Sequence, residues 1–216
     1  MSPEPTKHGA TFCSEILKAI RELTPDIPLS TRALEPFAGV GTGHQLGFDS
    51  LGVELEREWA CQHDRNIVGD VLHLDDVLPR GMRFGLAYSS PCYGNRFADK
   101  DFRDSAAGNY AKWLGRLASD GSSCHMQWGR RYKEFHVEAW RQVVDRLDGP
   151  FLLNISDHKR CTEPFRRAKV TDFHIGVFND LGFRVVACVP VETPRLQYGA
   201  NPLRMPAEMI IRFERS

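Results

Sequence analysis

Several features that would assign a protein to a class at once are missing from these 216 residues. No apolar run approaches the roughly 20 residues that a membrane-spanning helix needs. The N-terminus MSPEPTKHGA lacks the apolar core of a signal peptide, so we expect a cytoplasmic protein with no membrane contact. The six cysteines include no CxxC pair, which argues against a zinc site or a disulfide framework. We therefore expect no bound metal.

The chain also has no net charge, because 28 basic residues balance 28 acidic ones. A nucleic-acid partner would have to bind a local basic patch rather than the surface as a whole. The motif GxxxxGK[ST] is absent, which counts against a phosphate-binding loop of that kind. With 42% hydrophobic and 26% charged residues, the composition is that of an ordinary globular protein, so its function has to be sought in local motifs.

The order of apolar segments predicts an α/β fold with a mostly parallel sheet of about seven strands and helices on both faces. Helices are expected at 11–23, 44–52, 56–64, 131–147 and 170–182. Strands are expected at 32–37, 53–55, 66–71, 84–90, 151–156, 183–192 and 207–213. The last two strands have no helix between them, so we expect them to be antiparallel. We expect one domain over 1–216, with a long insert at about 91–130 that binds substrate.

The first three expected strands each end on residues suited to ligand binding. A glycine-rich turn, EPFAGVGTG (35–43), follows the first strand and allows the backbone to approach a ligand closely. The second strand ends on Glu54, which could accept both hydroxyls of a ribose, and Asp70 and Val71 follow the third. Each carboxylate alone could be a solvated loop residue. Together, at one edge of a parallel sheet, they predict a bound adenosine group.

The segments EPFAGVGTG, VELE, GDVL and SSPCYGN, in this order, resemble the motif series of class I S-adenosylmethionine-dependent methyltransferases. The resemblance extends over about residues 8–214 and implies a Rossmann-like fold with S-adenosylmethionine as the cofactor. HGATF (8–12) is similar to the N-terminal segment that these enzymes place against the methionine part of the cofactor. The cofactor-binding residues implied in this way are Phe12, Phe37, Ala38, Gly39, Gly41, Glu54, Asp70, Val71 and Ser89.

Ser90-Pro91-Cys92-Tyr93 resembles the (Asp/Asn/Ser)-Pro-Pro-(Tyr/Phe) motif of amino-methylating DNA methyltransferases. The segments SSPCYGNRFAD, QWGRRYKEFH and LNISDHKR are similar to small phage and bacterial DNA methylases. An exocyclic amine is a poor nucleophile because its lone pair is delocalised, and acceptors for both amine hydrogens redirect that lone pair. The resemblance implies that Ser90 and Pro91 are these catalytic acceptors. It also implies that Tyr93 stacks on a cytosine or adenine extruded from double-stranded DNA, giving N4 or N6 methylation.

Cys92 departs from this motif, in which a second proline is usual, and leaves another reaction open. Pro-Cys is also the nucleophile pair of cytosine carbon-5 DNA methyltransferases, which add the thiolate to the ring. That family supplies an acid as Glu-Asn-Val after strand five, whereas this sequence has Leu153-Asn154-Ile155. We therefore favour amino methylation, with Cys92 as a bystander. Methylation of RNA or protein amines, and a non-catalytic cofactor-binding subunit, are the remaining alternatives.

Basic residues interleaved with aromatic side chains follow the motif and indicate a nucleic-acid surface, with DNA as the expected partner. They extend through the insert, which includes Arg116, and recur at 159–169. Solvated charges, partly offset by acidic neighbours, are the alternative. The residues we expect to bind substrate are Asn95, Arg96, His158, Lys159 and Arg160. The imidazole of His158 could accept a proton near neutral pH or form a structural hydrogen bond. The sequence leaves the recognition site and the oligomeric state open.

Overall fold

One seven-stranded sheet organises the chain in a computed structural model that describes residues 12–93, 114–159, 167–192 and 207–216. Its strands are β1 (Arg32–Pro36), β2 (Asp49–Glu54), β3 (Asn66–Val68), β4 (Leu86–Ser89), β5 (Phe151–Ile155), β8 (Phe183–Glu192) and β9 (Ala207–Arg215). They lie in the order β3-β2-β1-β4-β5-β9-β8. The first five are parallel neighbours, and β9 runs antiparallel to both β5 and β8. The expected mostly parallel sheet with an antiparallel final strand is confirmed.

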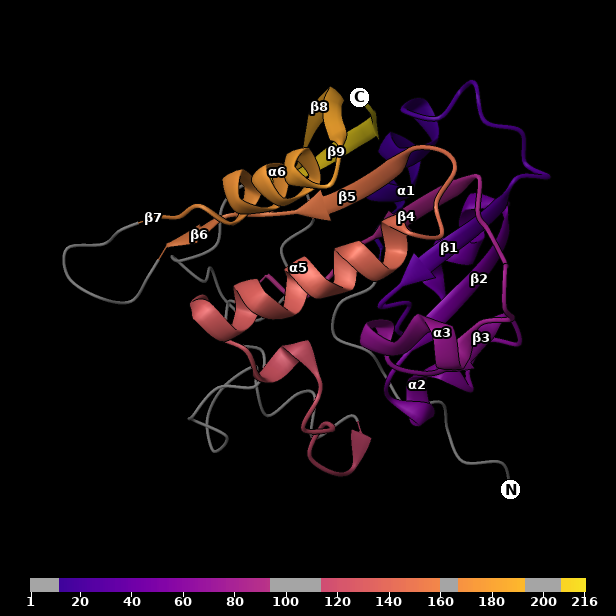
Figure 1. Cartoon of the computed structure of the whole chain (residues 1–216), viewed down its shortest axis with the longest axis vertical. Helices are drawn as coiled ribbons and strands as arrows, with labels where there is room; N and C mark the ends of the chain where they lie inside the picture. The colour runs from indigo at the N-terminus through magenta and orange to yellow at the C-terminus, as the bar shows by residue number, and fades with distance from the viewer. Residues whose placement is uncertain (1–11, 94–113, 160–166, 193–206) are drawn as a thin grey trace.

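Helices cover both faces of this sheet (Figure 1). One face carries α5 (Arg130–Val144), α6 (Val170–Asp180), α3 (Leu74–Val77) and the short 3-10 helix η2 (Val71–His73). The other face carries α1 (Ser14–Glu22) and η1 (Thr42–Leu46). The short α2 (Arg57–Ala60) follows β2, and the 3-10 helix η3 (Ser123–His125) precedes α5. In the part of the chain that is described, no helix is both long and apolar enough to span a bilayer.

Two cores form because neighbouring strand residues point to opposite faces. In β4, Leu86 and Tyr88 pack with α1, whereas Ala87 packs with α5 and α6. The core beneath α5 and α6 is rich in aromatic rings. Phe178 stacks on Phe213 with ring centroids 4.3 Å apart. Burial on both faces explains why these strands read as continuous apolar runs in the sequence.

The helix expected at 44–52 is wrong. Gly47 has φ of 82°, a left-handed conformation that ends η1 after Leu46. The chain then enters β2 at Asp49, which pairs with Arg32 of β1. All seven expected strands are present. The strand at 183–192 has the bounds that were expected, and the others begin or end at different residues. The segment 157–169 contains two short paired strands, β6 (His158–Lys159) and β7 (Arg167–Ala168), that the sequence pattern did not indicate.

Gly149 has to be glycine because the entries to β4 and β5 pass close together. A Cβ atom there would lie 1.9 Å from the backbone oxygen of Gly85. We expect Gly149→Ala to lower the free energy of unfolding by more than about 2 kcal/mol, because backbone must move. Gly176, inside α6, has open space around its would-be Cβ. Gly176→Ala is expected to raise stability by roughly 0.5–1 kcal/mol. Urea unfolding of both variants checks this, and equal effects would contradict it.

Candidate active site

The turn after β1 is shaped by three residues with positive φ: Phe37 at 62°, Gly39 at 54° and Gly41 at 79°. For Phe37 this left-handed backbone conformation is strained. Residues other than glycine adopt it mainly where function or packing requires it. The phenyl ring of Phe37 packs on Phe135 and Trp140 of α5, at 5.9 and 5.8 Å between ring centroids. The turn is therefore held from behind, and its backbone lies at the carboxyl end of the parallel strands.

Glu54, at the end of β2, is tied to this turn. One carboxylate oxygen accepts the Gly39 N–H at 2.8 Å, and the other accepts the Glu56 N–H at 2.9 Å. Burial raises the pKa of Glu54 to about 7, the charge of Glu56 adds to this, and the two N–H donors oppose it. A carboxylate predicted to meet a ribose is thus placed and oriented before any ligand binds.

Glu35, at the end of β1, is a second buried carboxylate that the sequence analysis did not single out. Its pKa lies well above the ordinary range, first because of burial and then because of the nearby Glu54 charge. Its Oε2 atom is buried without a hydrogen-bond partner among the described residues. A Cβ atom on Gly43 would lie 2.4 Å from that oxygen, so the glycine turn has to pack directly against it. A buried acceptor left unpartnered is costly and indicates a missing partner.

Of the remaining predicted cofactor residues, Phe12 and Ser89 contact this turn, and Asp70 and Val71 begin η2. The backbone N–H of Phe12 donates to the Thr42 hydroxyl at 3.2 Å, which places Phe12 beside the turn. Asp70 accepts the Leu72 N–H at 2.9 Å and so caps η2, of which Val71 is the first, buried residue. The Ser89 hydroxyl donates to the Pro36 carbonyl at 2.7 Å. Ser89 thus joins β4 to the turn through a buried bond.

On the other side of β4, four polar residues form one cluster. The Tyr93 hydroxyl donates to Glu208 at 2.8 Å and lies 3.1 Å from the Ser90 hydroxyl. Asn154 Nδ2 lies within 3.1 Å of Ser90, Tyr93 and Glu208 oxygens. Asn154 Oδ1 is buried and has no hydrogen-bond partner among the described residues. Pro91 is buried beside them.

The directions of these bonds follow from counting hydrogens. Tyr93 has a single hydroxyl hydrogen, which goes to the Glu208 carboxylate, so Ser90 must donate its own hydrogen to Tyr93. The two hydrogens of Asn154 Nδ2 are shared among the oxygens of Ser90, Tyr93 and Glu208, so Ser90 Oγ keeps at least one lone pair for another donor. The cluster therefore presents acceptors, Ser90 Oγ and Asn154 Oδ1, rather than donors.

Cys92 packs against one small apolar cluster, which is formed by Trp59, Leu114, Ala118 and Cys124. Its carbonyl oxygen accepts the Tyr132 hydroxyl at 3.0 Å. This arrangement holds the loop by its backbone and packs the Cys92 side chain among hydrophobic groups.

Behind Tyr132 runs a buried chain of hydrogen bonds. Trp140 Nε1–H donates to His174 Nδ1 at 2.8 Å, which leaves the hydrogen of His174 on Nε2, facing the Tyr132 hydroxyl at 2.9 Å. Burial holds the pKa of His174 well below its usual range, and the neighbouring His136 adds to this. The neutral imidazole thus donates a hydrogen bond to the Tyr132 hydroxyl, and that hydroxyl donates its own hydrogen to the Cys92 carbonyl. Two helices thereby fix the Ser90–Tyr93 loop.

The predicted substrate residues are only partly described. Asn95, Arg96 and Arg160 lie outside the described residues. His158 and Lys159 form β6, which extends from the end of β5 as one arm of a two-stranded hairpin (Figure 1). Of the basic residues in the insert, Arg116 binds the carboxylates of Glu56 and Glu58. It is therefore not available as a phosphate contact in this arrangement. No group of three or more potential metal ligands occurs within the described ranges.

Glu208 was missed because only the carboxyl ends of parallel strands were expected to carry site residues. Asn154 lies at such an end, that of β5, but was not assigned a role there. β9 is antiparallel, so its beginning lies at the same edge, and its Met209 pairs with Ile155 of β5. The signal was the glutamate in AEMIIRF, a charged residue in a strand that is otherwise mostly apolar at its start.

No protein-family model and no curated protein matches the chain. Its architecture is similar to solved methyltransferase structures. The glycopeptide N-methyltransferase MtfA complexed with S-adenosylmethionine has a TM-score of 0.53 at 15% identity, covering 100% of this chain and 99% of that one. The Synechocystis magnesium protoporphyrin IX methyltransferase with bound S-adenosylmethionine has 0.53 at 10% identity, covering 99% and 88%. A proposed RNA methyltransferase from Pyrococcus horikoshii has 0.53 at 14%, covering 92% and 81%.

These likenesses establish the fold, which is that of class I S-adenosylmethionine-dependent methyltransferases. One fold hosts many reactions, so the chemistry has to be argued from the site.

The raised pKa of Glu54 predicts how stability depends on pH. A carboxyl group with a folded pKa of about 7 stabilises the folded state below its ordinary pKa of 4.5 and loses that contribution as pH rises through 7. Between pH 5 and pH 8, Glu54→Gln should therefore lose about 2 kcal/mol less unfolding free energy than wild type. Urea unfolding at both pH values measures this. Equal losses in the two proteins would show that Glu54 is not the titrating group.

The Tyr132 hydroxyl is expected to matter for stability as well as for loop position. Tyr132→Phe leaves the partly buried Cys92 carbonyl and the buried His174 N–H without their partner. It should therefore lower the free energy of unfolding by about 1–3 kcal/mol. Tyr132 is fully buried, so the phenylalanine ring keeps the packing and isolates the hydroxyl. Thermal unfolding checks the prediction, and an unchanged melting temperature would refute it.

Proposed function

We propose that this protein binds S-adenosylmethionine and methylates an exocyclic amine of a base in DNA. The observation that carries the proposal is the polar cluster of Ser90, Tyr93, Asn154 and Glu208, which presents hydrogen-bond acceptors beside the cofactor end of a methyltransferase fold.

The residues at the other side of β4 fit S-adenosylmethionine. In this proposal Glu54 binds the ribose, Asp70 and Val71 contact the adenine, and the Phe37–Gly41 turn contacts the methionine part. The buried Oε2 of Glu35 has no hydrogen-bond partner among the described residues, so it can form a hydrogen bond with a polar group of the ligand. When bound, this cofactor supplies an electrophilic methyl group on a sulfonium. The chain's own part is to orient an amine towards it.

Two acceptors are required to orient a planar amine. One amine hydrogen can be accepted by the remaining lone pair of Ser90 Oγ, whose own hydrogen is committed to Tyr93. The carbonyl oxygen of Pro91, or the unpartnered Asn154 Oδ1, can accept the other. Binding both hydrogens favours a pyramidal nitrogen, whose lone pair is then localised. This is catalysis by alignment and local electrostatics.

The same cluster offers a path for the released proton. The amine nitrogen loses one proton when its new bond to carbon has formed. Ser90 Oγ can accept that proton while passing its own to Tyr93, and Tyr93 can pass its own to the Glu208 carboxylate. Each oxygen in the chain ends with the hydrogen count it needs, and Glu208 holds the proton.

The carbon-5 alternative gains one observation and loses another. Glu208 supplies a buried carboxylate where β5 itself has none. However, this carboxylate accepts hydrogen bonds from Tyr93 and Asn154, whereas the carbon-5 reaction needs a proton donor. Cys92 packs in an apolar cluster. The geometry therefore favours amino methylation over attack by Cys92.

The choice of DNA rests on the sequence resemblance and on the basic residues that recur at 159–169 in the sequence. The likeness to a proposed RNA methyltransferase makes RNA the second candidate substrate. Both substrates present planar amines, so the geometry of the site does not separate them. A methyl-transfer assay with each substrate can.

The test uses S-adenosylmethionine labelled with tritium in its methyl group, with unmethylated double-stranded DNA, tRNA and a protein extract as separate substrates. Nucleoside analysis of labelled DNA is expected to give N4-methylcytosine or N6-methyladenine. Ser90→Ala, which removes the acceptor, should lower kcat by about 100-fold. Cys92→Ala, in the same loop, is the matched control and should retain activity.

Two results would overturn parts of this proposal. If 5-methylcytosine forms and Cys92→Ala abolishes it, Cys92 is the nucleophile. If only tRNA or protein becomes labelled, the methyltransferase assignment holds and DNA is the wrong substrate.

A further inference from the structure

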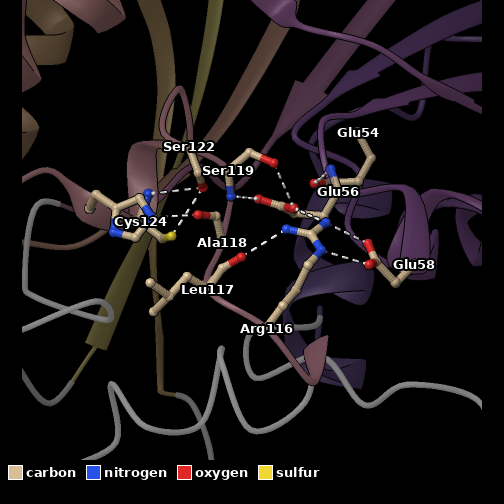
Figure 2. Close-up of polar contacts among 10 residues, drawn as sticks. Glu54, Glu56, Glu58, Arg116, Leu117, Ala118, Ser119, Ser122 and Cys124 are labelled. Atoms are coloured by element: carbon tan, nitrogen blue, oxygen red, sulfur yellow. Dashed lines mark hydrogen bonds and ion pairs between the residues drawn. The ribbon is translucent and has the colours of Figure 1, made fainter. Parts of the chain in front are cut away.

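Glu56 is a buried carboxylate at the cofactor end of the sheet that the proposed reaction does not use. Only 1% of the residue is exposed. Its two oxygens accept from three groups of a segment about 60 residues further along the chain. These are the Arg116 guanidinium at 2.8 Å, the Ser119 N–H at 2.8 Å and the Ser119 hydroxyl at 3.1 Å (Figure 2).

Arg116 also binds Glu58 through two nitrogens, each at 2.7 Å. These two pairs differ in strength, because Glu58 is partly exposed whereas Glu56 is buried. Exposed ion pairs contribute little, but a buried carboxylate that loses its donors is costly. Glu56 is therefore the carboxylate that fixes the position of this segment.

The anchored segment packs against two loops of the candidate site. Its residues Leu114, Ala118 and Cys124 form a small apolar cluster with Trp59 of α2. Val40 of the glycine turn and Cys92 of the target loop pack against that cluster. The segment thus touches both loops between which a methyl group would pass.

Gly121 places the same segment at the adenosine end. A Cβ atom on Gly121 would lie 3.8 Å from the Leu55 side chain and 3.9 Å from Asp70 Oδ2. Leu55 directly follows Glu54, and Asp70 is the residue expected to meet the adenine. The segment is therefore a neighbour of the residues that would hold the adenosine group.

We propose that residues 114–124 form the outer wall of the adenosine site, and that Glu56 is the positioning residue that holds this wall through Arg116 and Ser119. This inference rests on the proposed function, because it assumes that S-adenosylmethionine binds at the edge formed by Glu54 and Asp70. In this proposal the wall moves when the cofactor leaves, so the Glu56 contacts set the rate of cofactor release.

The first experiment measures release directly. Dissociation of S-adenosylmethionine is followed by stopped-flow fluorescence, for which Trp59 in the apolar cluster is a nearby reporter. Arg116→Gln is expected to dissociate about tenfold faster than wild type, since one donor to the buried carboxylate is lost. The KM for DNA should stay unchanged. Arg83→Gln is the matched control, because Arg83 binds Asp148 in a comparable but exposed pair remote from the site, and its dissociation rate should equal that of wild type.

A second variant protects the test against a folding defect in the first. Gly121→Phe adds a side chain beside Leu55 and Asp70 and should weaken cofactor binding at least tenfold. Gly176→Phe, where the added atoms meet open space, should leave binding unchanged. Melting temperatures of all variants identify any that are unfolded.

The outcomes separate the two claims. If wild type binds no S-adenosylmethionine, the proposed function fails, and this inference fails with it. If wild type binds and both Arg116→Gln and Gly121→Phe behave as wild type does, the wall is wrong while the proposed function stands. Faster release from Arg116→Gln with unchanged KM for DNA supports the wall.

Discussion

Three carboxylates are buried at one edge of the sheet, and their need for hydrogen-bond donors determines how the surrounding loops are positioned. Glu35, Glu54 and Glu56 are each nearly inaccessible to solvent, and a buried carboxylate must find donors. Glu54 takes the Gly39 N–H and so fixes the turn after β1. Glu35 packs directly on Gly43, and Glu56 fixes the segment that contains Ser119. Among these three carboxylates, Glu35 is the one with a buried oxygen, Oε2, that has no hydrogen-bond donor among the described residues.

A fourth buried carboxylate, Glu208, organises the opposite side of β4 in the same way. Glu208 accepts hydrogen bonds from the Tyr93 hydroxyl and the Asn154 amide. Ser90 Oγ therefore keeps a lone pair that can accept another hydrogen bond. The loop that carries Ser90 and Tyr93 is also held from behind, through Tyr132 and the Cys92 carbonyl. The two halves of the site meet where Cys92 and Val40 pack on one apolar cluster. Strand β4 therefore separates the region proposed to bind the adenosyl cofactor from the region proposed to bind the amine.

The fold could be predicted well from sequence because its signals are local. Apolar runs bounded by Gly and Pro located the strands, and the absence of a helix before 207–213 indicated the antiparallel end. The helix expected at 44–52 was wrong because Gly47 breaks it, and a glycine alone does not reveal its φ. The site was predictable where it lies at the ends of parallel strands, as for Glu54 and Asp70. It was not predictable where it depends on contacts between distant segments. Glu208 enters from an antiparallel strand, and the Arg116–Glu56 pair joins residues 60 positions apart. The stacking role expected for Tyr93 stays a prediction, because the structure places its hydroxyl on Glu208 and carries no base.

Calorimetric titration can show whether this edge of the sheet binds S-adenosylmethionine. S-adenosylmethionine, S-adenosylhomocysteine and NAD would be titrated into the full chain and into Glu54→Ala. We expect the first two to bind and NAD not to bind. Glu54→Ala should weaken binding at least tenfold, because the ribose loses its carboxylate. Absence of binding by wild type, or equal binding of NAD, would contradict these expectations.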